Sequence, residues 1–254
     1  MFLAFRTRRA SILAGLERCA NEAESHELYC HLLDLIMQLP SVMEALDMLV
    51  PNKSNNKTAE RSALIGLLQI CSGLHEQLLA WNQKLETQGH SPLYWMVPSV
   101  ASSPADDLVL GRVFPRVFQF PNLGIAQLLL VYWSTLILLY RTIQNIQNRL
   151  TRMATSGTET KHSLQSRDRS ELGSDHSCSF SNDRIVLLAN NICQSLEYCY
   201  RSTNGTHGVQ LAMFPVQVAQ SFYESQSDRG RELAWFSQLG NTTAPDSRFD
   251  LHLA

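Results

Sequence analysis

The chain has 254 residues, of which 44% are hydrophobic and only 17% are charged. A typical soluble domain is about 25% charged, so this sequence leans towards apolar residues. Lys and Arg total 21 and Asp and Glu total 23, whereas a free-standing nucleic-acid-binding protein usually carries a basic excess. Leucine occupies 38 positions, against 12 glycines and 9 prolines. This composition excludes collagen-like and Pro-rich classes and favours a mostly helical chain.

The first part of the chain shows three stretches of helical spacing. An amphipathic stretch at 8–23 places Ile12, Leu16 and Cys19 on one stripe. A second helix is predicted at 25–38, and Pro40 is expected to end it. Ser41 is then expected to cap a short helix that continues through Leu49.

The longest regular pattern runs from Thr58 to Glu86. Its apolar residues alternate spacings of three and four, at Leu64, Leu67, Cys71, Leu74, Leu78, Trp81 and Leu85. Such a stripe is typical either of one helix in a globular bundle or of a dimeric coiled coil. Leu68, His75 and Leu79 widen the stripe, which favours the globular bundle and leaves a homodimer open.

The middle of the chain is interrupted by prolines and then becomes strongly apolar. Residues 90–107 are expected to form an irregular, extended arm, and 112–121 a buried turn rich in Phe and Val. A long helix is predicted from Asn122 to about Arg152. Its most apolar part, Leu123 to Tyr140, carries no charge and is long enough to be marginal as a membrane span. Tyr132 and Trp133 lie mid-segment rather than at its ends, which favours a buried core helix, with a membrane-associated accessory protein as the alternative.

The last part of the chain begins with a change in composition. Residues 151–183 are rich in Ser, Thr and charge and are expected to form a disordered insertion whose phosphorylation is one route to regulation. Helices are predicted at 183–201, 212–225 and 228–239, with a turn at 204–208 and a flexible tail at 240–254. The domain prediction is therefore one helical domain built from 1–150 and 184–239.

No residues form a recognisable catalytic, cofactor-binding or metal site, so the chain is not expected to be an enzyme or to carry a cofactor. Glycine-rich phosphate loops and nucleophile motifs are absent from the sequence. His75 and Glu76 begin like a zinc-protease motif, but Leu79 stands where the second His belongs. The six cysteines include no pair spaced CxxC, and most are expected to be reduced, buried thiols.

Several short sequence blocks, taken in their order along the chain, together resemble one family. They are 32–40, 113–122 (Val-Phe-Pro-Arg-Val-Phe-Gln-Phe-Pro-Asn), 126–140, 188–199 (Leu-Ala-Asn-Asn-Ile-Cys-Gln-Ser-Leu-Glu-Tyr-Cys), 214–219 (Phe-Pro-Val-Gln-Val-Ala) and 231–235 (Arg-Glu-Leu-Ala-Trp). This ordered set resembles the regulatory region of fungal zinc-cluster transcription factors, and regulators of secondary-metabolite gene clusters look most similar.

The resemblance implies an all-α, irregular multi-helix bundle in the nucleus that controls transcription. It also exposes a departure, because such factors hold two zinc ions with CxxC-containing halves and this chain has none. The expected partners are therefore proteins, namely the transcription machinery or a DNA-binding regulator, with no direct nucleic-acid binding. Phe214 before Pro215, where the family commonly has Trp, is a milder departure.

Overall fold

The computed structural model describes residues 24–49, 57–88, 92–101, 105–107, 109–155 and 182–239. Helices dominate these ranges, which confirms the expected all-α class. They are α2 (Glu24–Ile36), α3 (Gln38–Met48), α4 (Lys57–Gln88), α5 (Leu123–Thr155), α6 (Asn182–Cys199), α7 (Gly205–Glu224) and α8 (Gly230–Leu239). The short strands β1 (Trp95–Pro98) and β2 (Arg116–Gln119) and a 3-10 turn, η2 (Ser202–Asn204), complete the described elements.

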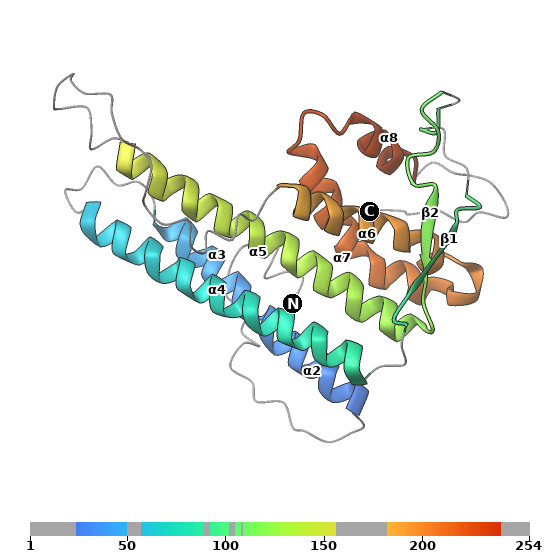
Figure 1. Cartoon of the computed structure of the whole chain (residues 1–254), viewed down its shortest axis with the longest axis horizontal. Coiled ribbons are helices and arrows are strands. Elements are labelled where there is room, and N and C mark those ends of the chain that lie inside the picture. The colour runs from blue at the N-terminus through green and yellow to red at the C-terminus, as the bar shows by residue number, and fades with distance from the viewer. Residues whose placement is uncertain are drawn as a thin grey trace, which may run out of the picture.

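Helix α5 is the centre of the fold. It runs diagonally through the molecule, with α2, α3 and α4 on one side and α6 and α7 on the other (Figure 1). Its side chains are buried on nearly every face between Ala126 and Ile143, and Leu129 and Trp133 are among the buried ones. A helix that is apolar all round is stable in water only inside a protein core, and the described neighbours supply that core.

Helices α2 and α3 form almost one helix, with a break at Met37. Pro40 has no backbone N–H and its ring clashes with the carbonyl four residues earlier, so the regular helix cannot run through this point. The chain resumes as α3 at Gln38, and Pro40 is tolerated in its first turn. The prediction that Pro40 ends one helix and Ser41 caps the next was wrong: α3 begins three residues earlier, without a side-chain cap.

Helix α4 runs along α2 and α3 in the opposite direction. The indole Nε1 of Trp81 donates a hydrogen bond to the Leu28 carbonyl at 2.9 Å, and Lys84 lies 3.4 Å from Glu27. The predicted stripe is buried, apart from the half-buried Leu67, and faces the core of this one chain. His75 is buried and Leu68 is half-buried against the core, as expected of the wider stripe, whereas Leu79 is 45% exposed.

A two-stranded antiparallel ribbon replaces the predicted arm and turn. Strand β1 pairs with β2 in a register that sets Val97 opposite Val117 and Met96 opposite Phe118. Strand β2 packs against α6, and the Phe118 ring lies against Trp133 of α5. Residues 117–119 of β2 are therefore buried. Pro98 occupies the end of β1, where the lost N–H disturbs the ladder least.

The chain returns from α6 into α7 through a close backbone contact. Gly208 lies against the carbonyl of Cys199, where a Cβ would overlap the carbonyl oxygen. The predicted turn at 204–208 is instead η2 and the first turn of α7, which begins at Gly205 rather than at Ala212. Pro215 is buried within α7 and removes one hydrogen bond to the preceding turn.

The boundaries of the predicted insertion shift at both ends. Helix α5 continues to Thr155, and α6 begins at Asn182, so residues 151–155 and 182–183 are helical rather than part of a loop. The last residues of α5, from Arg149 to Thr155, lie beyond the apolar pattern. They are half-buried or exposed. The rest of the predicted insertion, the amphipathic stretch at 8–23 and the tail at 240–254 lie outside the described residues.

Candidate functional site

The residues that resemble a zinc-protease motif have a structural role. His75 is buried, and its Nε2 lies 3.0 Å from the Tyr140 hydroxyl of α5. Burial lowers the pKa of His75 below its usual 6.5, the Arg184 charge lowers it further, and Glu76 opposes the shift. A neutral imidazole paired with a phenol joins two helices, and Glu76 points to the exposed side of α4.

Three of the described cysteines, Cys71, Cys193 and Cys199, are buried thiols, and Cys30 is half-buried. Burial raises the pKa of Cys71 to about 11 and that of Cys199 to about 12. Since the thiolate is the reactive species, these groups are poor nucleophiles and poor metal ligands near neutral pH. Cys19 and Cys178 lie outside the described residues.

Within the described ranges, no three His, Cys, Asp or Glu side chains are placed together to hold a metal ion. The carboxylate of Glu197 in α6 binds the segment that follows β1. It accepts hydrogen bonds from the Ser99 hydroxyl at 2.7 Å and from the amides of Val100 and Ala101 at 3.2 and 3.4 Å. Arg112 also donates to the Ser99 carbonyl. Glu197 therefore fixes the segment that follows β1, and nothing in its sequence spacing pointed to that contact.

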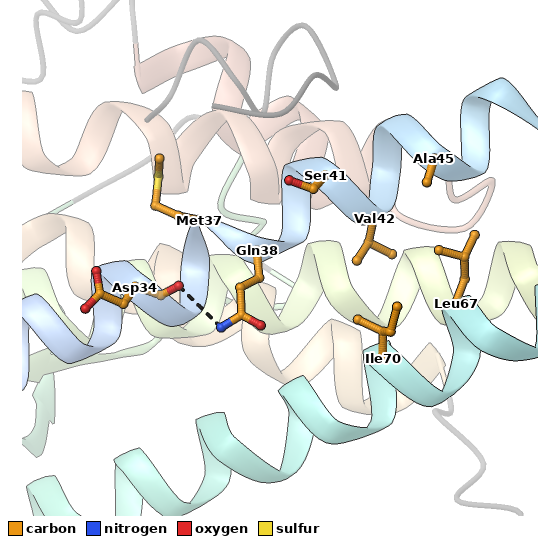
Figure 2. Close-up of a pocket in the computed structure, with 8 residues that line it drawn as sticks. All are labelled: Asp34, Met37, Gln38, Ser41, Val42, Ala45, Leu67 and Ile70. Carbon is orange, nitrogen blue, oxygen red and sulfur yellow. Dashed lines mark hydrogen bonds between the residues drawn. The ribbon is translucent and has the colours of Figure 1, made fainter. Parts of the chain in front are cut away.

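The candidate site is a groove of about 350 Å³ between α2, α3 and α4 (Figure 2). Its lining comes from the broken junction of α2 and α3 and from the facing turns of α4: Asp34, Met37, Gln38, Ser41, Val42, Ala45, Leu67 and Ile70. Val42, Leu67 and Ile70 point towards one another across it (Figure 2). The groove exists because the break at Met37 stops α2 and α3 from following α4 as one straight helix.

The groove has an apolar floor and a polar rim. Ile70 is 51% exposed, although it lies in the middle of a long helix. Asp34 and Gln38 form the rim on one side, where the Gln38 amide donates to the Asp34 backbone carbonyl at 3.5 Å. This arrangement suits apolar side chains with a polar or charged flank, as presented by an amphipathic segment. Sequence reasoning missed the groove because it treated Pro40 as an end of structure instead of a break within it.

Two of the described helices are long and apolar enough to cross a membrane, namely α5 and residues 57–87 of α4. In the most apolar 18-residue stretch of each helix, 72% of the stretch is buried inside the fold in α5 and 28% in α4. The low figure for α4 reflects its single buried face. The high figure for α5 is what the core helix of a protein domain shows.

A scan against protein-family models and searches of curated proteins and solved structures found no match to this chain.

Proposed function

We propose that this chain is a helical regulatory domain of the fungal zinc-cluster transcription factor type, acting on transcription through protein contacts. It has no catalytic role in this proposal and does not read DNA itself. Its partners are the transcription machinery or a DNA-binding regulator, its location is the nucleus, and its targets belong to a secondary-metabolite gene cluster. The support is the ordered set of sequence blocks together with the way these blocks pack.

The observation that carries the proposal is a chain of aromatic contacts between the blocks. Phe118 of the 113–122 block lies 5.9 Å from Trp133 of the 126–140 block, measured between ring centroids. Phe120 lies 5.1 Å from Tyr198 of the 188–199 block. Phe114 lies 4.8 Å from Trp235 of the 231–235 block. Residues far apart in the sequence therefore form one packed unit, as the parts of a single domain would.

The 214–219 block joins the same unit through helix packing. It lies in α7, which packs against both α5 and α6, and Phe214, Val216 and Ala219 are buried. Aromatic pairs of this kind are worth about 0.5–1.5 kcal/mol beyond the burial of their area. These contacts lie on the α6 and α7 side of α5, and the exposed faces of α2, α3 and α4 are the surfaces proposed for partners.

The test is a tethering assay. The full chain is fused to a heterologous DNA-binding domain and expressed in a fungal host that carries a reporter gene behind the matching operator. We expect the fusion to raise or lower reporter expression relative to the DNA-binding domain alone, because recruited partners act at the promoter. The chain without the fused domain should leave the reporter unchanged, since it brings no DNA contact of its own.

Equal reporter expression from the fusion and from the DNA-binding domain alone, at matched protein levels, would contradict the proposal. A folding control is needed for that comparison. The Gly208→Ala variant places a Cβ against the Cys199 carbonyl and disturbs the packed unit. It should abolish any reporter effect, whereas Gly73→Ala, which meets no neighbour, should retain it.

A further inference from the structure

The groove between α2, α3 and α4 is not used by the packed unit described above. Its apolar floor is Val42, Leu67 and Ile70, and Ile70 is about half exposed. Gly73 lies one helical turn from Ile70 on the same side of α4, and the space where its Cβ would lie is open. A second helix can therefore approach the α4 wall closely at this point.

The side of the groove formed by α2 and α3 carries one carboxylate, Asp34, and the lining residues include no Lys or Arg. Asp34 is exposed on the rim of the groove. A segment that fits here should pair an apolar stripe with arginine or lysine, because opposite charges across a contact favour the correct register.

The sequence immediately before α2 has this composition. Residues 5–19 read Phe-Arg-Thr-Arg-Arg-Ala-Ser-Ile-Leu-Ala-Gly-Leu-Glu-Arg-Cys. Helical spacing would place Phe5, Ile12, Leu16 and Cys19 on one stripe, and Arg9 falls on the same side. Four residues, 20–23, separate this segment from Glu24, and antiparallel helices are commonly joined by two to about five residues.

The register between residues 5–19 and α2 follows from counting along both segments, starting at the connection between them. If residue 19 lies beside residue 24, then residue 9 lies level with Asp34 and residue 5 lies level with Gln38. The known pairing of α2 with α4 has the same antiparallel sense, since Lys84 meets Glu27 and Trp81 meets Leu28. Carried further along, it sets Gln38 level with Ile70. In this register Phe5 would lie level with the apolar floor and Arg9 level with Asp34.

We propose that the groove between α2, α3 and α4 is the docking site of this chain's own residues 5–19, with Phe5 between Met37, Val42 and Ile70 and Arg9 beside the Asp34 carboxylate. The proposal does not rest on a role in transcription and can fail or succeed independently of it.

The experiment replaces Phe5 by the photoreactive amino acid p-benzoylphenylalanine in the full chain. Irradiated benzophenone inserts into nearby C–H bonds and reacts readily with methionine, and Met37 lines the groove. We expect a crosslink from position 5 to Met37 or its groove neighbours within one chain, located by mass spectrometry on the monomer band. Crosslinked dimers would show that a second copy occupies the groove, and crosslinks at other sites or none at all would also overturn the proposal.

Two sets of variants test whether the groove itself directs the crosslink. Ile70→Arg should lower the yield at least about fivefold, whereas Leu79→Arg, on the same helix and exposed on another face, should leave it unchanged. Asp34→Arg should also lower the yield, and Arg9→Glu in the same chain should restore it. Asp34, Ile70 and Leu79 are exposed, so a folded protein is expected from each of these substitutions. A yield that Ile70→Arg and Leu79→Arg lower equally would contradict docking in the groove.

Discussion

The Nε2 atom of His75 lies 3.0 Å from the hydroxyl oxygen of Tyr140, and the two rings meet edge to face with centroids 5.4 Å apart. The pair is buried where α4 crosses α5, and Arg184 of α6 lies near enough for its charge to act on the imidazole. Protonating His75 would put a positive charge into this buried contact, where the Arg184 charge disfavours it. The neutral imidazole is therefore part of what holds α4 to the central helix.

The stability of the fold should depend on pH through His75. Its pKa is lowered in the folded chain by burial first and by Arg184 second, whereas the unfolded chain titrates near the ordinary value of about 6.5. Below about 6.5 the unfolded state binds the proton first, so the free energy of unfolding falls as pH drops, until the folded pKa is passed. The slope from one site cannot exceed about 1.4 kcal/mol per pH unit.

Urea unfolding at a series of pH values measures this dependence. His75→Gln should weaken the loss of stability below about pH 6.5, because no imidazole remains to be protonated. His207→Gln is the matched control, since His207 is exposed on α7. A pH dependence that is the same in the wild type and in His75→Gln would refute the assignment.

Gly208 should be intolerant of any side chain. An added Cβ would overlap the backbone carbonyl of Cys199, which cannot rotate away as a side-chain end could. We expect Gly208→Ala to lower the free energy of unfolding by at least about 1–3 kcal/mol. Gly73→Ala in α4 meets nothing within 4 Å and should instead raise it by about 0.5–1 kcal/mol. Chemical denaturation followed by far-ultraviolet circular dichroism measures both, and equal effects would disprove the close contact.

Arg149 should stabilise the end of α3. Its guanidinium donates to the Leu46 and Leu49 carbonyls at 3.0 and 2.8 Å, at the end of the helix where backbone carbonyls run out of partners within the helix. Arg149→Met keeps the aliphatic packing but removes both bonds, and should cost about 1–3 kcal/mol. Arg152→Met, one turn later and exposed, should change stability by less than about 0.5 kcal/mol. If the two variants unfold at the same denaturant concentration, the contact contributes nothing.

The sequence predicted the long helices well because their apolar spacing is unbroken. Leu64 to Leu85 in α4 and Ile185 to Cys199 in α6 both face the core, as the stripes indicated. The prolines were less informative. Pro40 lies in the first turn of α3, where proline is tolerated, so the helix begins before it rather than after it. Pro215 lies inside α7, where α5 and α6 pack against the helix.

The ribbon and the candidate groove depend on long-range contacts that no local pattern contains. Strand β2 is only four residues long and is fixed by pairing with β1 and by packing on α6. The Glu197 contact with Ser99 spans 98 positions of sequence. The groove exists only because α4 returns beside the break at Met37, so its lining residues lie on three elements and share no motif.

Leu129 tests whether α5 is a core helix of this chain. It is 2% exposed, and replacing it by Ala should lower the free energy of unfolding by roughly 2–5 kcal/mol, as other large-to-small core substitutions do. Leu187 of α6 is 60% exposed, and Leu187→Ala should change stability far less. Thermal or urea unfolding of the two purified variants gives the comparison, and a Leu129→Ala variant as stable as wild type would count against burial in the core.

The most direct measurement is alkaline carbonate extraction of membranes from cells that express the full tagged chain. If α5 is buried between α2, α3, α4, α6 and α7, the chain is released into the supernatant, because its apolar residues are already covered by protein. Any fraction of the chain that remains in the pellet should also sediment when no membranes are present, as aggregated protein does. A chain that floats with lipid and resists carbonate would contradict a protein core built on α5 and would establish the membrane-associated alternative.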